Sequence, residues 1–282
     1  MPRRVALLGA TGQTGQAVLK DLLDREISIN IYVRSASKLI QKFPSLSSMP
    51  NTQIFSGEIS DSTLIKNLLT DVDVIIFTLG WNENRRGPTI IEDGARAVVN
   101  ALRELNEEQK QKQKQEQPPR LIFLSSMTWN ETLHGNTPSL HTRMIRLAFY
   151  YPYQDLLAGQ RILLSEPSLL KVTLIQPPAL IEEPASGYDI SIDKAGAGCS
   201  YPDLGGSMVE VALDEAYESV PAVMVTSKAG HDFGRLDRNG KRMTKHTAAG
   251  IPTWSPTVVL ICRSTAYVWQ SGRDAQFSAD CG

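Results

Sequence analysis

The hydrophobic positions near the start of the chain change period within a few residues. Val5–Leu8 is a short apolar run that stops at Gly9, and Thr14–Leu23 then carries apolar residues at helical spacing. A short apolar run bounded by glycine is typical of a buried strand, and the longer spaced pattern is typical of an amphipathic helix. The pattern therefore predicts a strand followed directly by a helix.

This alternation of strand and helix continues along the chain to about residue 176. The further predicted strands are Ile29–Val33, Gln53–Phe55, Val74–Phe77, Leu121–Leu124 and Val172–Ile175, and the further predicted helices are Ser62–Leu69 and Pro88–Leu105. Alternating strands and helices form a parallel sheet that is covered on both faces. We therefore predict an α/β fold, a Rossmann-like doubly wound parallel sheet with helices on both faces and a small C-terminal lid region over about 180–230.

Two stretches interrupt the alternation. Asn106–Pro119 is rich in Gln, Lys and Glu, and it is predicted to be a solvated helix end followed by a loop. From about His231 the chain carries seven basic against four acidic residues, and Val258–Cys262 is an isolated apolar run among turn-rich residues. We therefore expect a folded domain over 1–230 and a tail over 231–282 that is partly disordered and adds little to function.

Composition, charge and cysteine spacing argue against several classes of protein. The 282 residues are 41% hydrophobic with a net charge of −1, so no basic excess favours general binding to nucleic acid or to a membrane surface. No apolar run approaches the roughly 18 residues of a membrane-spanning helix, and the N-terminus lacks the pattern of a secretory signal. The three cysteines show no C-x-x-C spacing, which favours a reducing compartment without disulfides or zinc. These features predict a cytoplasmic protein without a metal.

The first turn between strand and helix has the pattern of a phosphate-binding loop. Glycines at positions 9, 12 and 15 form G-x-x-G-x-x-G. Gly9 allows the tight turn, Gly12 lets backbone N–H groups approach a pyrophosphate, and Gly15 lets the helix pack closely on the sheet. The helix N-terminus then faces the phosphates. We therefore predict a dinucleotide site that includes Gly9, Thr11, Gly12, Gln13, Thr14 and Gly15.

The end of the second predicted strand bears on the choice of dinucleotide. Sites specific for NAD place an Asp or Glu there, about 20 residues after the loop, to bind the ribose hydroxyls. This chain has Arg34 at that point, followed by Ser35, Ser37 and Lys38. A guanidinium with a nearby ammonium group suits the 2′-phosphate of NADP. Arg34 and Lys38 therefore favour NADP(H) over NAD(H).

These motifs resemble the NmrA-like, NAD(P)-binding branch of the atypical short-chain dehydrogenase/reductase superfamily. The resemblance covers roughly residues 3–230. Two segments, Tyr150–Leu164 and Tyr201–Val225, are more narrowly similar to the averufin oxidase-type proteins of fungal aromatic-polyketide pathways. The residues that carry the wider resemblance are Gly9–Gly15, Val33-Arg34, Gly57–Asp61, Ser125-Ser126 and Gln176–Pro178.

The resemblance implies further contacts with the cofactor. The Gly57–Asp61 turn would lie beside the adenine, with Glu58 where Asp is usual. Ser125 and Ser126 would end the fifth strand beside the nicotinamide. The other implied neighbours of the cofactor are Thr78, Leu79 and Gly80 after the fourth strand, and Pro177, Pro178 and Ala179 on the far side of the nicotinamide.

The same resemblance implies a Ser and a Tyr that act on the substrate oxygen, with a Lys four residues after the Tyr. Ser126 is suitably placed, and Tyr151 and Tyr153 follow at the distance expected for the Tyr. The Lys is absent, and a phenol without it is a poor base at neutral pH. Ser126 with Tyr151 or Tyr153 is therefore the catalytic candidate; packing of an aromatic helix face on the sheet is the alternative for the tyrosines.

Other polar and aromatic residues allow two interpretations each. Asp155 is expected on a helix surface, with a proton acceptor facing the pocket as the alternative. His134 and His141 are expected to be solvated loop residues, with a catalytic role at the substrate entrance as the alternative. Trp81 and Trp129 follow strand ends at the edge where open α/β sheets bind substrates, so they either stack on an aromatic substrate or pack in the interior.

Together these features predict an NADP(H)-dependent oxidoreductase that tailors an aromatic polyketide-like small molecule. Its partner would be that small molecule, with neither nucleic acid nor a membrane. Because the catalytic Lys is absent, two alternatives stay open. One is a redox sensor that binds NADP(H) without turnover, and the other is a non-redox isomerase or cyclase with the same fold.

Overall fold

The computed structural model describes residues 4–81, 83–111, 117–130, 139–194, 196–229, 259–262 and 265–268. The chain forms two compact units, residues 1–231 and residues 232–282. In the second unit, β11 (Val259–Cys262) pairs antiparallel with β12 (Thr265–Val268). The isolated apolar run of the tail thus forms a strand, whereas the predicted partial disorder falls mainly on residues outside the described ranges.

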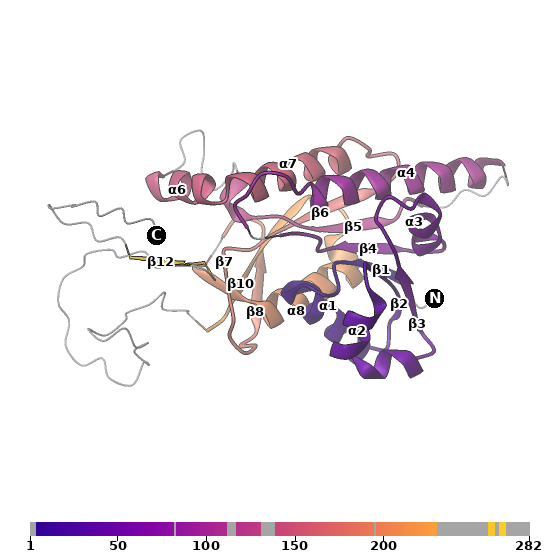
Figure 1. The fold of residues 1–282 in the computed structure, drawn as a ribbon, viewed down its shortest axis with the longest axis horizontal. Coiled ribbons are helices and arrows are strands. Elements are labelled where there is room, and N and C mark those ends of the chain that lie inside the picture. Colours follow the sequence, from indigo (N-terminus) through magenta and orange to yellow (C-terminus); the bar gives the residue numbers. More distant parts are fainter. Residues whose placement is uncertain are drawn as a thin grey trace, which may run out of the picture. The chain divides into compact units, whose positions relative to one another are not determined.

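The first unit is built on an eight-stranded sheet in the order β3-β2-β1-β4-β5-β6-β10-β8 (Figure 1). Every neighbouring pair is parallel except β10 and β8. The chain order reverses between β1 and β4, which makes this the switch point where doubly wound sheets bind ligands. The strands are β1 (Arg4–Leu8), β2 (Ser28–Val33), β3 (Thr52–Ser56), β4 (Val74–Phe77), β5 (Arg120–Leu124), β6 (Lys171–Gln176), β8 (Tyr188–Ser191) and β10 (Ala222–Ser227).

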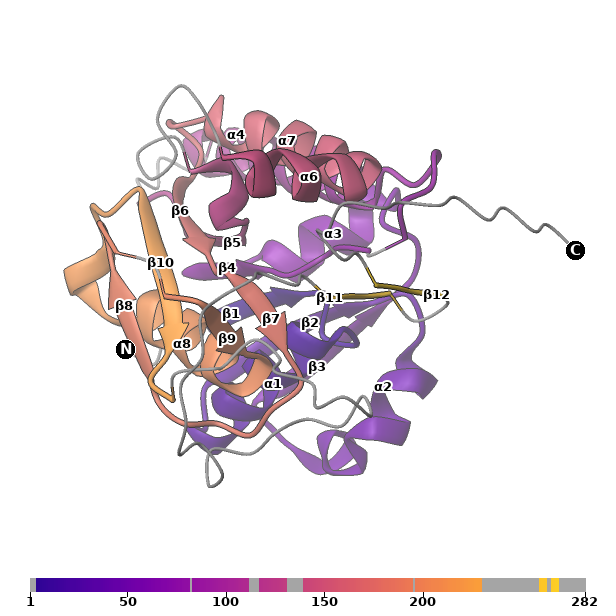
Figure 2. The same ribbon diagram turned by 90° about the vertical axis from the view of Figure 1, so that its left-hand side faces the viewer.

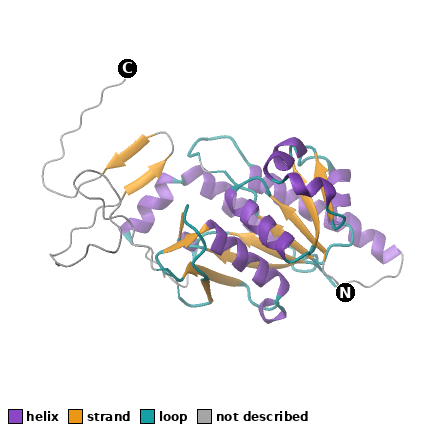
Figure 3. Ribbon diagram, turned by 90° about the horizontal axis from the view of Figure 1, so that it is seen from below, coloured by secondary structure: helices purple, strands orange, loops and turns teal. Residues whose placement is uncertain are grey.

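Helices cover both faces of this sheet (Figure 2). One face carries α1 (Gln13–Asp24), α2 (Ala36–Lys42) and α8 (Tyr201–Leu213), and Figure 3 shows this face from below. The other face carries α3 (Ser62–Leu69), α4 (Ile90–Gln111) and α7 (Tyr150–Leu164), with α6 (Leu140–Ala148) beside α7. The predicted doubly wound fold is therefore confirmed.

The apolar runs form strands because both of their faces are covered. Val5, Ala6, Leu7 and Leu8 of β1 are fully buried, and alternate residues enter the two separate cores above and below the sheet. Continuous apolar runs of this kind are typical of central parallel strands. Short 3₁₀ turns complete the connections: η1 (Pro44–Ser48), η2 (Met127–Trp129) and η3 (Glu215–Tyr217).

The structure contains α2 between the second and third strands, a helix that the apolar pattern did not predict, and it also differs from the predicted lid. Helix α4 ends at Gln111, within the Asn106–Pro119 stretch that was predicted to begin as a helix end; its Glu, Gln and Lys residues are strong helix formers, and Lys66 of α3 pairs with Glu108. The region 180–230 is larger than a lid: β8 and β10 extend the sheet and α8 covers it. β7 (Ala179–Ile181) and β9 (Gly198–Ser200) form a separate two-stranded pair, and a lid role for them stays a prediction.

Among the helices of the described residues, none is both long and apolar enough to cross a membrane.

Candidate active site

The glycine loop is compressed between β1, β4 and α1. Gly9 has a φ of +100°, and a Cβ there would lie 2.6 Å from the backbone of Thr78. A Cβ on Gly15 would lie 2.0 Å from the Gly9 carbonyl oxygen. Both distances are far below van der Waals contact, so the turn and the approach of α1 require glycine at these positions. The two structural roles predicted for Gly9 and Gly15 agree with this geometry.

Gly12 occupies a different environment in the same loop. A Cβ there would meet only the Gly9 carbonyl oxygen, at 3.5 Å, and Thr11, Gly12 and Gln13 are exposed. No side chain caps the first turn of α1, whose leading N–H groups therefore have no partner within the helix. Open space above Gly12 beside uncapped N–H groups fits an anionic pyrophosphate.

The three residues after β4 have different roles: one supports the glycine loop, one packs in the core and one is free to contact a cofactor. Thr78 is buried, and its hydroxyl donates a hydrogen bond to the Leu8 carbonyl oxygen over 2.8 Å, which braces the glycine loop from behind. Leu79 packs against the core below α4, and Gly80 is exposed with open space around it. Of these three residues, Gly80 has the free surface that a cofactor could contact.

Basic side chains gather at the end of β2 and along α2. Arg34 and Lys38 are exposed, and neither has a hydrogen-bond or ion-pair partner among the described residues. Lys42, one helical turn after Lys38, donates its Nζ to the Thr11 carbonyl oxygen over 3.3 Å. This contact brings the cationic end of α2 against the glycine loop. Sequence reasoning missed Lys42, although its i+4 spacing from Lys38 was a usable signal.

The turn Gly57–Asp61, which was predicted to lie beside the adenine, is held by hydrogen bonds. The Tyr32 hydroxyl donates to the Gly57 carbonyl oxygen over 3.2 Å. Burial raises the pKa of Tyr32, and the nearby Glu58 adds to this rise, so the hydroxyl remains a donor. Asp61 accepts a hydrogen bond from the Leu64 N–H and caps α3.

Ser126 and Tyr153 meet beyond the carboxyl end of β5. The Ser126 Oγ and the Tyr153 hydroxyl are 3.4 Å apart, although 27 positions separate them in the chain. Thr128 joins them: its Oγ1 accepts from Ser126 over 3.1 Å and from Tyr153 over 3.2 Å. Three hydroxyl groups therefore form one cluster. Sequence reasoning selected Ser126 and Tyr153 but missed Thr128, because no motif marked it.

The tyrosine neighbours of Tyr153 lie elsewhere. Tyr150 and Tyr151 are 49% and 37% exposed and stack edge to face on each other. The Tyr151 backbone N–H donates to Asn84 Oδ1 over 3.1 Å. Of the two predicted catalytic tyrosines, the structure thus brings Tyr153 to Ser126 and leaves Tyr151 near the surface.

Trp129 and Arg146 support the hydroxyl cluster. The guanidinium of Arg146 lies 4.0 Å from the centroid of the Trp129 ring, and the Trp129 ring meets Tyr153 edge to face. Arg146 also donates from Nη2 and Nε to the Thr128 carbonyl oxygen, over 2.7 and 3.2 Å. One face of Trp129 is therefore occupied by Arg146 and cannot stack on a substrate.

Asp155 is buried, which contradicts the expectation that its carboxylate lies on a helix surface. It is only 4% exposed, and it accepts hydrogen bonds from the backbone N–H groups of Ile91 and Glu92 at the start of α4. Its third donor is the Trp81 Nε1, over 3.0 Å. The alternative of a free proton acceptor in a pocket does not fit three occupied contacts either. Asp155 is buried because the uncapped N-terminus of a neighbouring helix needs an acceptor.

The ends of β5 and β6 are joined in the region predicted to hold the nicotinamide. The Ser125 hydroxyl, 6% exposed, donates to Gln160 Oε1 over 2.8 Å. The Met127 N–H donates to the Pro177 carbonyl oxygen over 3.2 Å, and Pro178 is partly exposed. Of the two candidate histidines, His134 lies outside the described residues. His141 falls on α6, not on a loop as predicted.

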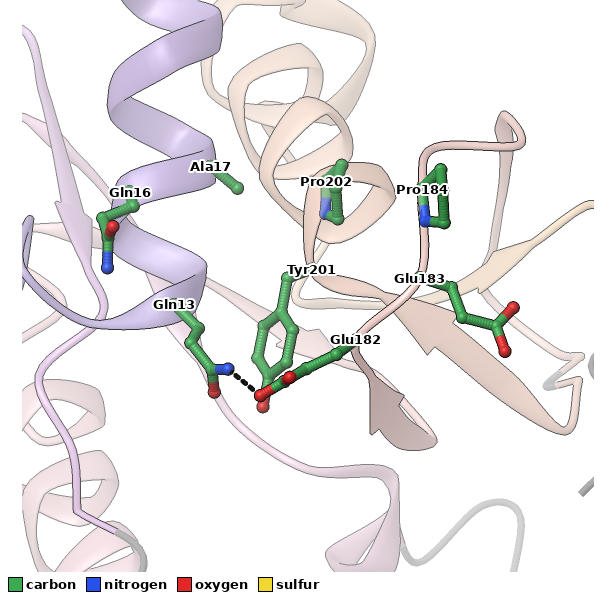
Figure 4. A pocket seen from close by; sticks show the side chains of 8 residues that line it. All are labelled: Gln13, Gln16, Ala17, Glu182, Glu183, Pro184, Tyr201 and Pro202. Atoms are coloured by element: carbon green, nitrogen blue, oxygen red, sulfur yellow. Dashed lines mark hydrogen bonds between the residues drawn. The ribbon is translucent and has the colours of Figure 1, made fainter. Parts of the chain in front are cut away.

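A pocket of about 380 Å³ opens beside the start of α1 (Figure 4). On its floor the Gln13 side chain donates to Glu182 Oε1, next to the Tyr201 ring. Burial raises the pKa of Tyr201, and Glu182 adds to this rise. The pocket adjoins the predicted pyrophosphate site because Gln13 directly follows Gly12. Its lining residues are Gln13, Gln16, Ala17, Glu182, Glu183, Pro184, Tyr201 and Pro202.

Comparison with known proteins places these features in a family. The sequence model of the NAD(P)H-binding family matches residues 9–215. The chain is 33% identical over 230 residues to the oxidoreductase ordB of Dothistroma septosporum, a match that covers 81% of this chain and 85% of the relative. It is 29% identical over 247 residues to averufin oxidase A of Aspergillus flavus, covering 83% and 86% of the two chains.

Solved structures show the same fold. A short-chain dehydrogenase/reductase from Veillonella parvula, solved in complex with NADP, superposes with a TM-score of 0.59 at 18% identity, covering 82% of this chain and 97% of that one. An anaerobilin reductase from Escherichia coli superposes with a TM-score of 0.58 at 16% identity, covering 80% and 98%.

Proposed function

This chain belongs to the NAD(P)H-binding family, and we propose that it is an NADP(H)-dependent oxidoreductase that reduces an aromatic, polyketide-like small molecule. The observation that carries the proposal is the pairing of Ser126 with Tyr153 at the carboxyl edge of the sheet, on the same edge as the open glycine loop. A hydroxyl pair beside a dinucleotide site can bind and protonate a carbonyl oxygen.

Basic residues at the end of β2 and on α2 support NADP(H) over NAD(H). Arg34, Lys38 and Lys42 supply three cations on the side of the glycine loop where the adenosine ribose of a bound dinucleotide would lie. None of them has a carboxylate partner among the described residues. Cations without carboxylate partners suit a 2′-phosphate. The NADP complex of the Veillonella protein, which shares this fold, agrees with the proposal.

Two observations support an aromatic substrate. One relative over most of the chain is named for the oxidation of averufin. Trp81, held by Asp155, is only partly buried and follows Gly80 at the carboxyl edge of β4. Its hydrogen-bonded indole offers a ring face of fixed orientation, and offset stacking on such a face is favourable for an aromatic ligand.

Each residue of the site has its own role in the proposed reduction. When bound, NADPH supplies the hydride. The glycine loop holds the pyrophosphate, and the Ser126 hydroxyl orients the substrate carbonyl. Tyr153 donates its phenolic proton to the carbonyl oxygen, a role that suits a phenol better than proton abstraction because phenols are neutral at physiological pH. The missing lysine therefore favours reduction over oxidation of the substrate.

The test is NADPH oxidation by the purified chain with a panel of quinones and anthraquinones, followed by the loss of nicotinamide absorbance. We expect turnover with at least one aromatic carbonyl compound and a large loss of kcat in Ser126→Ala, with NADPH binding retained. Tight NADPH binding without turnover for any compound would contradict the proposal in favour of a redox sensor. Conversion of a compound without any change in the nicotinamide would indicate an isomerase or cyclase.

A further inference from the structure

The cluster around Tyr153 lacks the cation that the resemblance implies beside the catalytic tyrosine. Among the described residues, the hydrogen-bond partners of the Tyr153 hydroxyl are Ser126 and Thr128. Its ring is enclosed edge to face by Trp129 and Phe149. Leu157 stands where the lysine of the related dehydrogenases would be. Something else must stabilise the tyrosine after it has given up its proton.

We propose that Thr128 is a positioning residue that performs this function through its hydroxyl group. In the structure the Thr128 Oγ1 accepts protons from both Ser126 and Tyr153. The hydroxyl hydrogen of Thr128 itself is free to rotate, because a threonine hydroxyl is both a donor and an acceptor. When Tyr153 becomes a phenolate, the same 3.2 Å contact can carry a hydrogen bond from Thr128 to the phenolate oxygen. A hydrogen bond to the charged form favours that form.

This inference rests on the proposed reduction, whose balance is simple. A bound NADPH would supply a hydride to the carbonyl carbon, while the O–H bond of Tyr153 would break as its proton bonds to the carbonyl oxygen. The products would be the alcohol, oxidised nicotinamide and the Tyr153 phenolate. Thr128 neither gains nor loses a proton; it changes from acceptor to donor. The phenolate then takes a proton from water.

Arg146 fixes the geometry that this exchange needs. Its guanidinium donates two hydrogen bonds to the Thr128 carbonyl oxygen and packs on Trp129, and these contacts hold the η2 turn with Thr128 beside Tyr153. Arg146 is also the charged side chain that lies against this turn from α6. The nearest acidic side chain on α7, Asp155, is directed to the start of α4 and to Trp81. The hydroxyl contacts therefore carry the stabilisation of the phenolate.

The experiment compares Thr128→Val with Thr128→Ser. Valine keeps the shape and removes the hydroxyl, whereas serine keeps the hydroxyl. A hydrogen bond to a charged group contributes about 1.5–3 kcal/mol, so Thr128→Val should lower kcat by about tenfold to a hundredfold. The dissociation constant of NADPH should not change, and Thr128→Ser should restore most of kcat. Equal activity of Thr128→Val and the wild type, or failure of Thr128→Ser to restore kcat, would overturn the proposal.

A second measurement uses the protein without cofactor. The ultraviolet absorbance of tyrosinate is followed against pH, and Tyr153→Phe variants of the same backgrounds are subtracted so that Tyr153 alone is seen. Thr128→Val should move the titration of Tyr153 to higher pH, and Thr128→Ser should leave it near the wild type. An unchanged titration in Thr128→Val would overturn the role of Thr128 even if the wild type oxidised NADPH. If the wild type shows no turnover, the proposed function fails, while this titration still decides the role of Thr128.

The contribution of Arg146 has a matched control on the same helix. Arg143 lies one turn earlier on α6 and is exposed. Arg146→Met should lower kcat and move the Tyr153 titration in the same direction as Thr128→Val, whereas Arg143→Met should do neither. Equal behaviour of the two arginine variants would contradict the assignment of Arg146.

Discussion

The glycine-loop side and the tyrosine side of the sheet edge are held together by different kinds of contact. At Gly9 and Gly15 the backbone of one element lies directly against the backbone or side chain of another, with no room for a Cβ. At Ser126, Thr128 and Tyr153 the contacts are hydroxyl hydrogen bonds of 3.1–3.4 Å between side chains. Side chains can be exchanged without moving the backbone. The second site can therefore change its chemistry while the first keeps its cofactor.

The largest expected effect is a difference in stability between alanine variants of two glycines in the same loop. Gly15→Ala places a Cβ 2.0 Å from the Gly9 carbonyl oxygen, so the helix must move, and we expect a loss of about 3 kcal/mol or more of stability. Gly12→Ala places a Cβ at 3.5 Å, so thermal unfolding should be nearly unchanged while NADPH binding is lost. Unfolding curves and NADPH titrations of both variants check this difference. Equal destabilisation by the two substitutions would contradict it.

The next effect concerns the tyrosines. Tyr153→Phe removes the proposed proton donor, and loss of general acid catalysis should lower kcat by about a hundredfold or more. Tyr151→Phe, two residues away and 37% exposed, should change kcat by less than about twofold, since exposed substitutions are close to neutral. Steady-state kinetics of both variants at saturating NADPH measure the contrast. A larger loss in Tyr151→Phe would transfer the role to Tyr151.

Asp155 tests the connection between the two sides. Asp155→Ala leaves two backbone N–H groups of α4 and the Trp81 indole without their acceptor, and loss of a helix cap with buried donors should cost about 2 kcal/mol. The matched control is Asp189→Ala on β8, whose side chain is 71% exposed, and it should be near neutral. Chemical denaturation measures both. If Asp155→Ala matched the control, the capping role would be wrong.

The smallest expected effect concerns cofactor choice. Arg34→Ala removes one of three cations near the proposed 2′-phosphate, and we expect about a tenfold weaker affinity for NADPH, equal to about 1.4 kcal/mol. The affinity for NADH, which has no 2′-phosphate, should hardly change. Parallel titrations with both nucleotides give the comparison. Equal losses for NADPH and NADH would remove the basis for NADP(H) preference.

The fold could be predicted because it depends on local patterns. The helix over Ser62–Leu69 and the strand over Val74–Phe77 have the predicted bounds, since apolar period and flanking residues determine them. The glycine loop could equally be predicted, because Gly9 and Gly15 stand where the backbone leaves no room for a Cβ. The end of α4 was predicted only as some part of Asn106–Pro119, since an ion pair between Lys66 of α3 and Glu108 helps to support it.

The tyrosine side was less predictable because its contacts join residues far apart in the chain. Thr128 reaches Tyr153 because the fold brings the η2 turn, which follows β5, against α7. Asp155 is buried because it accepts hydrogen bonds at the start of α4. Neither side chain stands out in a linear pattern. The choice between Tyr151 and Tyr153 likewise required the direction of each side chain on α7.

The most direct test of the central claim is a titration of the purified chain with NADPH and with NADH, followed by nicotinamide fluorescence or by calorimetry, with Gly12→Ala as the control. We predict saturable binding to the wild type, tighter for NADPH than for NADH, and loss of both in a Gly12→Ala protein that still unfolds cooperatively. Absence of binding by the folded wild type, or equal binding by Gly12→Ala, would contradict the assignment of the glycine loop as a dinucleotide site.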